Sequence, residues 1–198
     1  MDQLPTFMLA VLALLATPGP TNTLMAAAGA QRGVAGSLPL LAGELGGYAI
    51  AITLWIELVG VAAASQPLVP VLAKVAASAF LLWSAAKLWR NAGQADLAQR
   101  GITLGRVFAT TLINPKALVF AFAIFPQVGF VARLPYLGLL FILVTVTAVG
   151  WMALGTLAAR SSAGLLTSSR VERITAVALS VFAALLAVQT VQGMLVVG

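Results

Sequence analysis

The stretch LLATPGPTNTLM, residues 14–25, interrupts an apolar run that otherwise predicts a membrane-spanning helix over residues 4–28. Such a helix needs about 20 mostly apolar residues, which this run supplies. Pro18 and Pro20 have no N–H to donate to the carbonyls one turn earlier, and a carbonyl left free in hydrocarbon is costly. We therefore predict a broken helix, and we expect the break to do more than anchor the chain in lipid.

The composition predicts the fold class. The chain has 198 residues, of which 61% are hydrophobic and only 8% are charged. An ordinary soluble domain is about half apolar and about a quarter charged, so lipid is the expected solvent here. We predict an all-α polytopic membrane protein, because apolar runs of about 20 residues are too long for barrel strands. Six spans are expected, at residues roughly 4–28, 36–62, 67–89, 107–130, 135–158 and 174–196.

The basic residues predict how the spans are oriented. The loops after spans one, three and five are basic, and the opposite loops offer only Arg133. The basic side chains are Arg32, Lys87, Arg90, Arg100, Arg106, Arg160, Arg170 and Arg173. Since cytoplasmic loops carry an excess of Lys and Arg, we predict a multi-pass protein of the bacterial inner membrane with these loops in the cytoplasm and both termini outside. The net charge of +6 follows from this topology and indicates no nucleic-acid partner.

Residue types that are missing limit the chemistry. The chain contains no cysteine and no histidine. This removes thiolate sites and the imidazole that serves as metal ligand or proton relay. Intramembrane hydrolases generally need such groups, so we predict that the chain is not an enzyme, and we expect no cofactor and no metal site. The start MDQLP lacks the basic residues of a cleaved signal peptide, so we expect the first span in the mature protein.

The two halves of the chain resemble each other. TPGPTN, residues 17–22, has a counterpart in TLINPK, residues 111–116, about half a chain later. Three spans per half would insert the second half upside down, as in many secondary transporters built from inverted repeats. We predict a single transmembrane transporter domain over residues 1–198. It has repeat one at about 1–90, a basic loop at about 90–106 and repeat two at about 107–198.

Polar features from three spans share one depth. Pro20, Glu44 and Lys116 each lie about ten residues from the basic side, roughly 15 Å into the membrane. A helix that restarts at Pro20 offers backbone amides to a carboxylate, and the freed carbonyls suit an ammonium, so the break suits an amino acid. We predict a substrate site with Glu44 as the candidate for proton coupling. The site residues are Thr17, Pro18, Gly19, Pro20, Thr21, Asn22, Glu44, Asn114, Pro115 and Lys116.

The same residues have plainer interpretations. The break can be a simple kink whose polar side chains satisfy the backbone, and Glu44 can form an ion pair with Lys116. Glu57 and Lys74 lie near the outer ends of adjacent spans, and we predict that they pair. Glycines in GELGG, residues 43–47, favour close helix packing over a gap for substrate. We assign the four tryptophans, Trp55, Trp83, Trp89 and Trp151, to the membrane interface, without a chemical role.

Three motifs together resemble a known family. TPGPTN, LINPKALVFAFAIFPQV at residues 112–128, and GVAGSLPLLAGELGGY at residues 33–48 resemble the lysine-exporter and homoserine–threonine-exporter family, the LysE/RhtB-type translocators. The resemblance covers essentially the whole chain and implies about six spans and export of amino acids or related compounds from the bacterial cytoplasm. The chain departs from the family pattern at Thr21, where asparagine is usual, and at Phe80, where tyrosine is common. At Glu44 the family often has aspartate.

We therefore predict a secondary active exporter of amino acids or related small metabolites, coupled to protons and working by alternating access. A passive channel or a non-transporting membrane subunit is the alternative. The partners we expect are a small-molecule substrate and membrane lipid. The small number of acids favours a neutral amino acid over a dicationic one. The sequence leaves open whether the chain forms a homo-oligomer.

Overall fold

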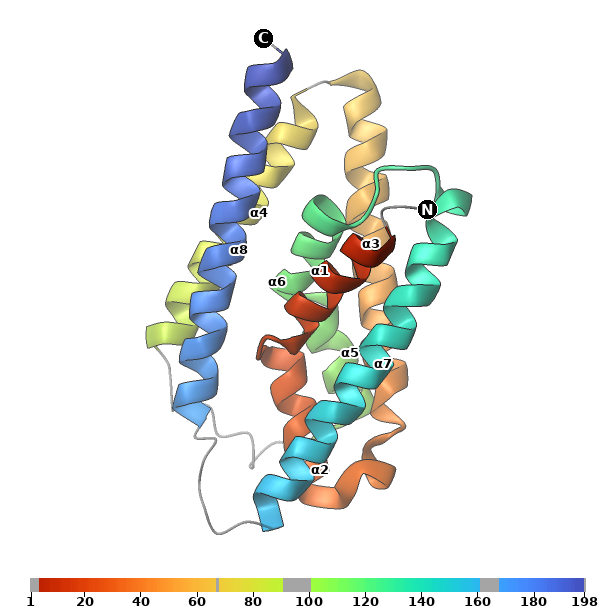
Figure 1. The fold of residues 1–198 in the computed structure, drawn as a ribbon, viewed down its shortest axis with the longest axis vertical. Coiled ribbons are helices and arrows are strands. Elements are labelled where there is room, and N and C mark those ends of the chain that lie inside the picture. The colour runs from red at the N-terminus through yellow and green to blue at the C-terminus, as the bar shows by residue number, and fades with distance from the viewer. Residues whose placement is uncertain (1–3, 67, 91–100, 161–167, 198) are drawn as a thin grey trace.

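The computed structural model describes residues 4–66, 68–90, 101–160 and 168–197, and all of its regular elements in these ranges are helices (Figure 1). The all-α prediction is thereby confirmed. The elements are α1 (Leu4–Ala16), α2 (Pro20–Ser37), α3 (Leu40–Ser65), α4 (Val69–Arg90), α5 (Leu104–Leu112), α6 (Pro115–Val119), the π-helix η1 (Phe120–Ile124), α7 (Phe130–Arg160) and α8 (Ser168–Val197). The predicted basic loop at 90–106 falls largely on residues 91–100, which lie outside the described residues, as do residues 161–167 between the fifth and sixth spans.

Six spans result when each broken helix is taken as one span. In the described residues, α3, α4, α7 and α8 each contain a segment long and apolar enough to cross a membrane alone. The pair α1 and α2 passes the same test together, with a bend of 63°, and so does α5 with α6–η1, with a bend of 46°. Both predicted breaks are confirmed, in the first and the fourth span.

Both breaks restart their helix in the same way. Pro20 and Pro115 each stand at the first helical turn, where a missing N–H costs nothing. Asn114 is the N-cap of α6, and its Oδ1 accepts a hydrogen bond of 3.0 Å from the Lys116 N–H. Gly19 is the N-cap of α2, with φ −171 and ψ 170. This is extended backbone that any residue adopts, so the backbone angles at Gly19 do not require a glycine.

Glycines allow the first and fifth spans to pack closely through α2 and α7. Helix α2 packs along α7. A Cβ added to Gly155 would lie 1.8 Å from the Ala26 carbonyl oxygen, and one added to Gly29 would lie 2.0 Å from that of Met152. The two backbones therefore touch directly, which is what small residues permit between helices in a membrane.

Helix α3 also packs along α5 through glycines that allow close approach. A Cβ on Gly43 would lie 2.6 Å from the Leu104 carbonyl oxygen, and one on Gly47 would lie 2.7 Å from Thr111 Cβ. The predicted packing role of these two glycines is confirmed. The remaining helices α4 and α8 pack chiefly on each other and lie at one side of the bundle (Figure 1).

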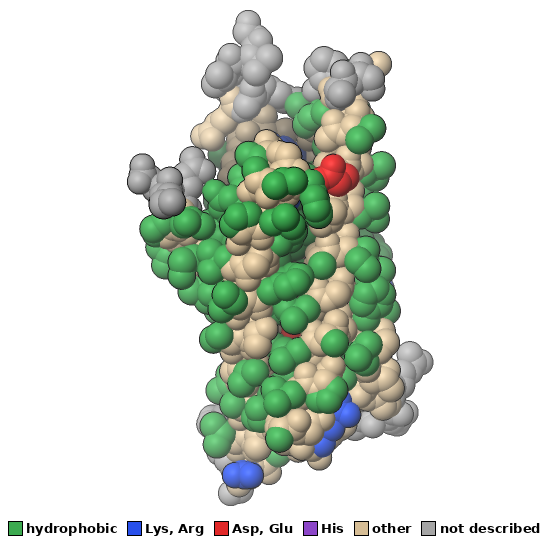
Figure 2. Space-filling model, turned by 90° about the vertical axis from the view of Figure 1, so that its right-hand side faces the viewer, with side chains coloured by type: hydrophobic (Ala, Val, Ile, Leu, Met, Phe, Trp, Pro, Cys, Tyr) green, Lys and Arg blue, Asp and Glu red, His purple; other side chains and the backbone are tan. Residues whose placement is uncertain are grey.

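The surface fits a lipid environment. Figure 2 shows a face on which hydrophobic side chains cover most of the height, while Lys and Arg side chains gather at the lower end. The start of α1 and the end of α8 both lie toward the opposite end (Figure 1). The molecule thus has a basic end, and the large apolar side chains on its flanks are exposed where lipid would cover them.

Candidate functional site

The two breaks meet inside the bundle. Asn114 Nδ2 donates a hydrogen bond of 2.9 Å to Thr21 Oγ1, and the hydroxyls of Thr21 and Thr111 lie 3.1 Å apart. All three side chains are buried, with at most 3% of each residue exposed. Thr21, the position where the chain departs from the family pattern, therefore ties the first broken span to the second.

Lys116 crosses from one break to the other. Its ammonium Nζ donates a hydrogen bond of 2.5 Å to the carbonyl oxygen of Thr17, and the residue is 1% exposed. The side chain passes over Gly19, where an added Cβ would lie 3.0 Å from Lys116 Cε and 3.1 Å from Nζ. The absence of a side chain at Gly19 is therefore what admits the lysine. A buried cation needs a partner, and here the partner is a backbone carbonyl.

Other side chains satisfy the carbonyls at the end of α1. Asn22 Nδ2 donates to the Leu15 carbonyl at 2.8 Å and to that of Thr17 at 2.9 Å. Thr17 Oγ1 donates to the Leu14 carbonyl at 2.7 Å. The Leu14 carbonyl, to which Pro18 cannot donate a hydrogen bond, is therefore already bonded by the Thr17 hydroxyl and needs no ligand. The ammonium that we expected from a substrate is supplied at this break by Lys116 itself.

The second break satisfies its own backbone as well. Pro115 has no N–H to donate to the carbonyl of Thr111, and that oxygen instead accepts a hydrogen bond of 3.1 Å from the Asn114 N–H. The Thr111 hydroxyl in turn donates to the Val107 carbonyl at 2.8 Å. The polar groups of both breaks thus form one connected, enclosed network.

Glu44 lies on α3 beside this network without joining it. The residue is 1% exposed, and its Oε2 has no hydrogen-bond partner in the described structure. Among the described residues it makes no ion pair with Lys116. Tyr48, one turn later on α3, is fully buried, and its hydroxyl likewise has no partner. Sequence reasoning missed Tyr48, although its spacing of four residues from Glu44 places both on one helix face.

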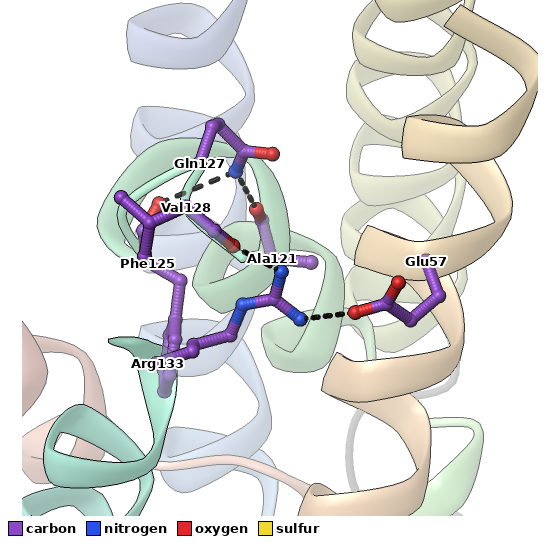
Figure 3. A network of polar contacts seen from close by, with 6 residues as sticks. All are labelled: Glu57, Ala121, Phe125, Gln127, Val128 and Arg133. Carbon is purple, nitrogen blue, oxygen red and sulfur yellow. Dashed lines mark hydrogen bonds and ion pairs between the residues drawn. The ribbon is translucent and has the colours of Figure 1, made fainter. Parts of the chain in front are cut away.

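The predicted pair of Glu57 with Lys74 is wrong. Glu57 Oε1 accepts from Arg133 Nη1 at 2.6 Å, and Arg133 Nη2 also donates to the Val128 carbonyl at 2.6 Å (Figure 3). Helix α4, which carries Lys74, packs chiefly on α8 rather than along α3. An arginine can also bind a carboxylate and a carbonyl at once, because its guanidinium spreads several donors in a fixed plane.

A cavity of about 1110 Å³ lies between α4 and the second broken span. Pro20, Asn114 and Pro115 reach its wall, so both breaks border it. Its volume is slightly above that of typical small-molecule sites in proteins, which enclose roughly 300–1,000 Å³, so it has room for an amino acid. Aromatic side chains make up much of the remaining lining: Trp55, Phe80, Trp83 and Phe122. Trp55 and Trp83, to which we assigned no chemical role, thus belong to the cavity.

The predicted site residues are therefore brought together in two groups. Hydrogen bonds or close approach join Thr17, Gly19, Thr21, Asn22, Asn114 and Lys116. Pro20 and Pro115 border the cavity, and Pro18 lies within the first break. Glu44 faces the same interior from α3 and makes no bond to either group in the described structure.

Comparison with known proteins assigns the family. The sequence profile of the LysE type translocator family matches residues 12–191, which include both breaks and the cavity. The chain belongs to the LysE type translocator family. No solved structure matches it.

Two relatives in this family carry a named activity. The homoserine/homoserine lactone efflux protein of Salmonella typhimurium is 32% identical over 123 residues, which are 59% of this chain and 59% of that protein. The protein of the same name from Salmonella typhi is 40% identical over 60 residues, 27% of this chain and 29% of that protein. The matches thus span less than two thirds of the length of these LysE-type relatives.

Proposed function

We propose that this chain exports amino acids or closely related small metabolites from the bacterial cytoplasm across the inner membrane. The observation that carries the proposal is the meeting of two broken spans at the wall of one cavity, which Pro20, Asn114 and Pro115 all line. Broken helices at the centre of a bundle are where secondary transporters bind their substrates. Membership in a family of translocators supports export and supports the prediction that the chain is not an enzyme.

Lys116 exchanges partners when substrate binds. In the described structure its ammonium rests on the Thr17 carbonyl, at the edge of the network that ties the breaks together. A substrate carboxylate that enters from the cavity attracts this ammonium away, and the Thr17 carbonyl is then open to a second donor. The exchange replaces one charged hydrogen bond by another of similar strength, so it costs little net free energy. Thr21, Asn22 and Asn114 hold the two breaks in place during the exchange.

Alternating access follows from the two halves as inverted three-helix repeats. The first span packs on the fifth through α2 and α7, and the fourth packs on the second through α3 and α5. The third and sixth spans, α4 and α8, pack on each other. If the two repeats are exchanged, spans one, two and three take the places of spans four, five and six. The contact between spans one and five then becomes the contact between spans four and two, and the contact between spans three and six is unchanged. This pairing supports one transmembrane domain of two repeats that rock around the site, with the basic loops in the cytoplasm.

Glu44 couples export to protons. The Glu44 carboxyl is buried, and its Oε2 has no hydrogen-bond partner in the described structure. A proton that binds there removes a buried negative charge that no described residue neutralises by direct contact. Proton binding and substrate release then alternate at neighbouring positions.

The cavity supports a neutral amino acid as substrate. Lys87 is the one charged side chain among the described residues of its lining, and no acid is present there to hold a second positive charge. Homoserine is the first compound to test, since the relatives are named for efflux of homoserine and its lactone.

An export screen tests the proposed function. Cells that express the chain are loaded with dipeptides, and the amino acids that appear outside are followed against cells with an empty vector. We expect a neutral amino acid to leave several-fold faster, and a protonophore to reduce the difference. Flux that persists without a gradient, with no counter-flow, indicates a channel instead. No faster release of any amino acid contradicts the proposal.

A further inference from the structure

We propose that Tyr48 is a substrate-binding residue, and that its hydroxyl together with Glu44 holds the free ammonium group of the substrate. The inference rests on the proposed function and deepens it, because it requires that the substrate keep a primary amine.

Unpartnered polar atoms mark this position. Among the described residues, buried side-chain atoms without a hydrogen-bond partner occur only on Glu44, Tyr48 and Arg133. Arg133 belongs to the ion pair near the other end of α3, whereas Glu44 and Tyr48 stand one turn apart. A buried tyrosine hydroxyl normally finds a partner, and a buried group without one is costly. Two such groups on one helix face indicate a shared partner that arrives from outside the chain.

The spacing suits an ammonium. Residues four apart on a helix have their Cβ atoms about 5–6 Å apart. The side chains of Glu44 and Tyr48 form no hydrogen bond with each other in the described structure. A donor with several N–H groups, placed between them, can bond both the carboxylate and the hydroxyl oxygen, and a primary ammonium has three such donors.

An aromatic contact holds the Tyr48 ring in place. It packs edge-on against Phe120, with the ring centroids 5.4 Å apart and the planes at 88°. Phe120 opens the π-helix that follows α6, the short helix that begins beside Lys116. Gly47, next to Tyr48, is pressed against Thr111 of the second break. The ring of Tyr48 is therefore held against the segment that also carries Lys116, the residue proposed to bind the substrate carboxylate.

The two charged ends of an amino acid thus have separate places. Lys116 takes the carboxylate, and Glu44 with Tyr48 takes the ammonium. A substrate whose amine is acylated has neither the charge nor the three donors, so it loses this half of the site.

The test uses the two tyrosines of the chain as a matched pair. Tyr48→Phe removes the unpartnered hydroxyl and keeps the ring on Phe120. Tyr136→Phe is the control, because Tyr136 also packs edge-on against an aromatic ring, that of Phe7, at 5.0 Å between centroids. Efflux of L-homoserine and of N-acetyl-L-homoserine is measured from proteoliposomes, and thermal unfolding is measured on the same samples in detergent.

We expect Tyr48→Phe to slow homoserine efflux about fivefold to tenfold, which is what one hydrogen bond is worth. Its unfolding temperature should stay at or above that of the wild type, because the lost hydroxyl has no protein partner. Tyr136→Phe should keep the wild-type rate, and N-acetyl-L-homoserine should leave far more slowly than homoserine. In the combination with Glu44→Gln, the two losses should be less than additive, because both groups bind one ammonium.

Several outcomes overturn the inference. The ammonium site is contradicted if Tyr48→Phe keeps the wild-type rate. It is also contradicted if the wild type exports homoserine and its N-acetyl derivative at equal rates. Neither result contradicts the proposed export function. A slower rate together with a clear fall in unfolding temperature shows that the hydroxyl has a structural partner. A wild-type protein that moves no amino acid removes both the function and this inference.

Discussion

The two ends of the bundle are closed by different forces. At the basic end, backbones touch across glycines, and an apolar cluster fills the remaining space. The cluster comprises Leu24, Met25, Ala28, Leu40, Ile102, Val107, Ala148 and Met152. At the far end the closure is polar. Arg133 joins Glu57 to the Val128 carbonyl, and Gln127 caps the carbonyls of Ala121 and Phe125 around the π-helix (Figure 3).

This difference indicates how each end can open. Separating the basic end exposes closely fitted backbone and side-chain surface all at once. Opening the far end requires one ion pair and a few hydrogen bonds to exchange, and Glu57 is already half-exposed. The structure therefore describes a helical bundle that is tightly closed toward its basic end and held at the other end by side-chain bonds that can exchange. Substitutions at each end test this difference in packing.

The largest effect is expected where α2 meets α7. In Gly155→Ala the new Cβ would lie 1.8 Å from the Ala26 carbonyl oxygen, so the two helices must separate. We expect a loss of about 3 kcal/mol in the free energy of unfolding, the upper end of the usual cost of overpacking. Thermal unfolding followed by tryptophan fluorescence in detergent measures it.

Gly150→Ala on the same helix is the matched control. An added Cβ there meets nothing within 4 Å. It should be neutral or stabilise by about 0.5–1 kcal/mol, because alanine favours helix over glycine. Equal effects of the two substitutions would contradict close backbone packing at the basic end.

A smaller effect is expected at the far end, with an asymmetry between the two partners. The Arg133 side chain is 4% exposed and that of Glu57 is 48% exposed. Glu57→Ala leaves a buried guanidinium whose remaining acceptor among the described residues is the Val128 carbonyl, which should cost about 1–2 kcal/mol. Arg133→Met leaves only a carboxylate that already reaches the surface, so it should cost less.

Thermal unfolding of the two single variants and the double variant checks this order. A larger loss for Arg133→Met than for Glu57→Ala would show that the arginine is held by packing rather than by its charge. A loss at either position that exceeds that of Gly155→Ala would reverse the comparison between the two ends.

The sequence predicted those features that depend on local chemistry. Apolar runs predict spans, and a proline that removes a backbone donor predicts a break wherever it occurs, so the bends at Pro20 and Pro115 could be read directly. Asn114 and Lys116 were placed at the second break by the same argument. The six spans and both broken helices of the structure agree with these predictions.

The partners of the charged groups could not be predicted in this way. Depth alone suggests Lys74 for Glu57, but which spans lie side by side is decided by tertiary packing, and the structure selects Arg133. Lys116 finds a carbonyl rather than Glu44, because Gly19 leaves room for it to cross between the breaks. The spacing of four residues between Glu44 and Tyr48 is visible in the sequence. Only the structure shows that the Tyr48 hydroxyl is buried without a hydrogen-bond partner, which is what makes it a candidate binding residue.

If the two breaks meet to form the transport site, then replacing Lys116, which connects them, should slow transport. The measurement is the initial rate of gradient-driven homoserine efflux from proteoliposomes. Lys116→Met is compared with Lys74→Met, the same substitution at a lysine of α4 that has no part in the hydrogen-bond network joining the two breaks. We predict that Lys116→Met slows efflux about tenfold or more, as expected for the loss of a hydrogen bond to a charged group, and that Lys74→Met keeps the wild-type rate. Full gradient-driven efflux in both Lys116→Met and Glu44→Gln would contradict the site.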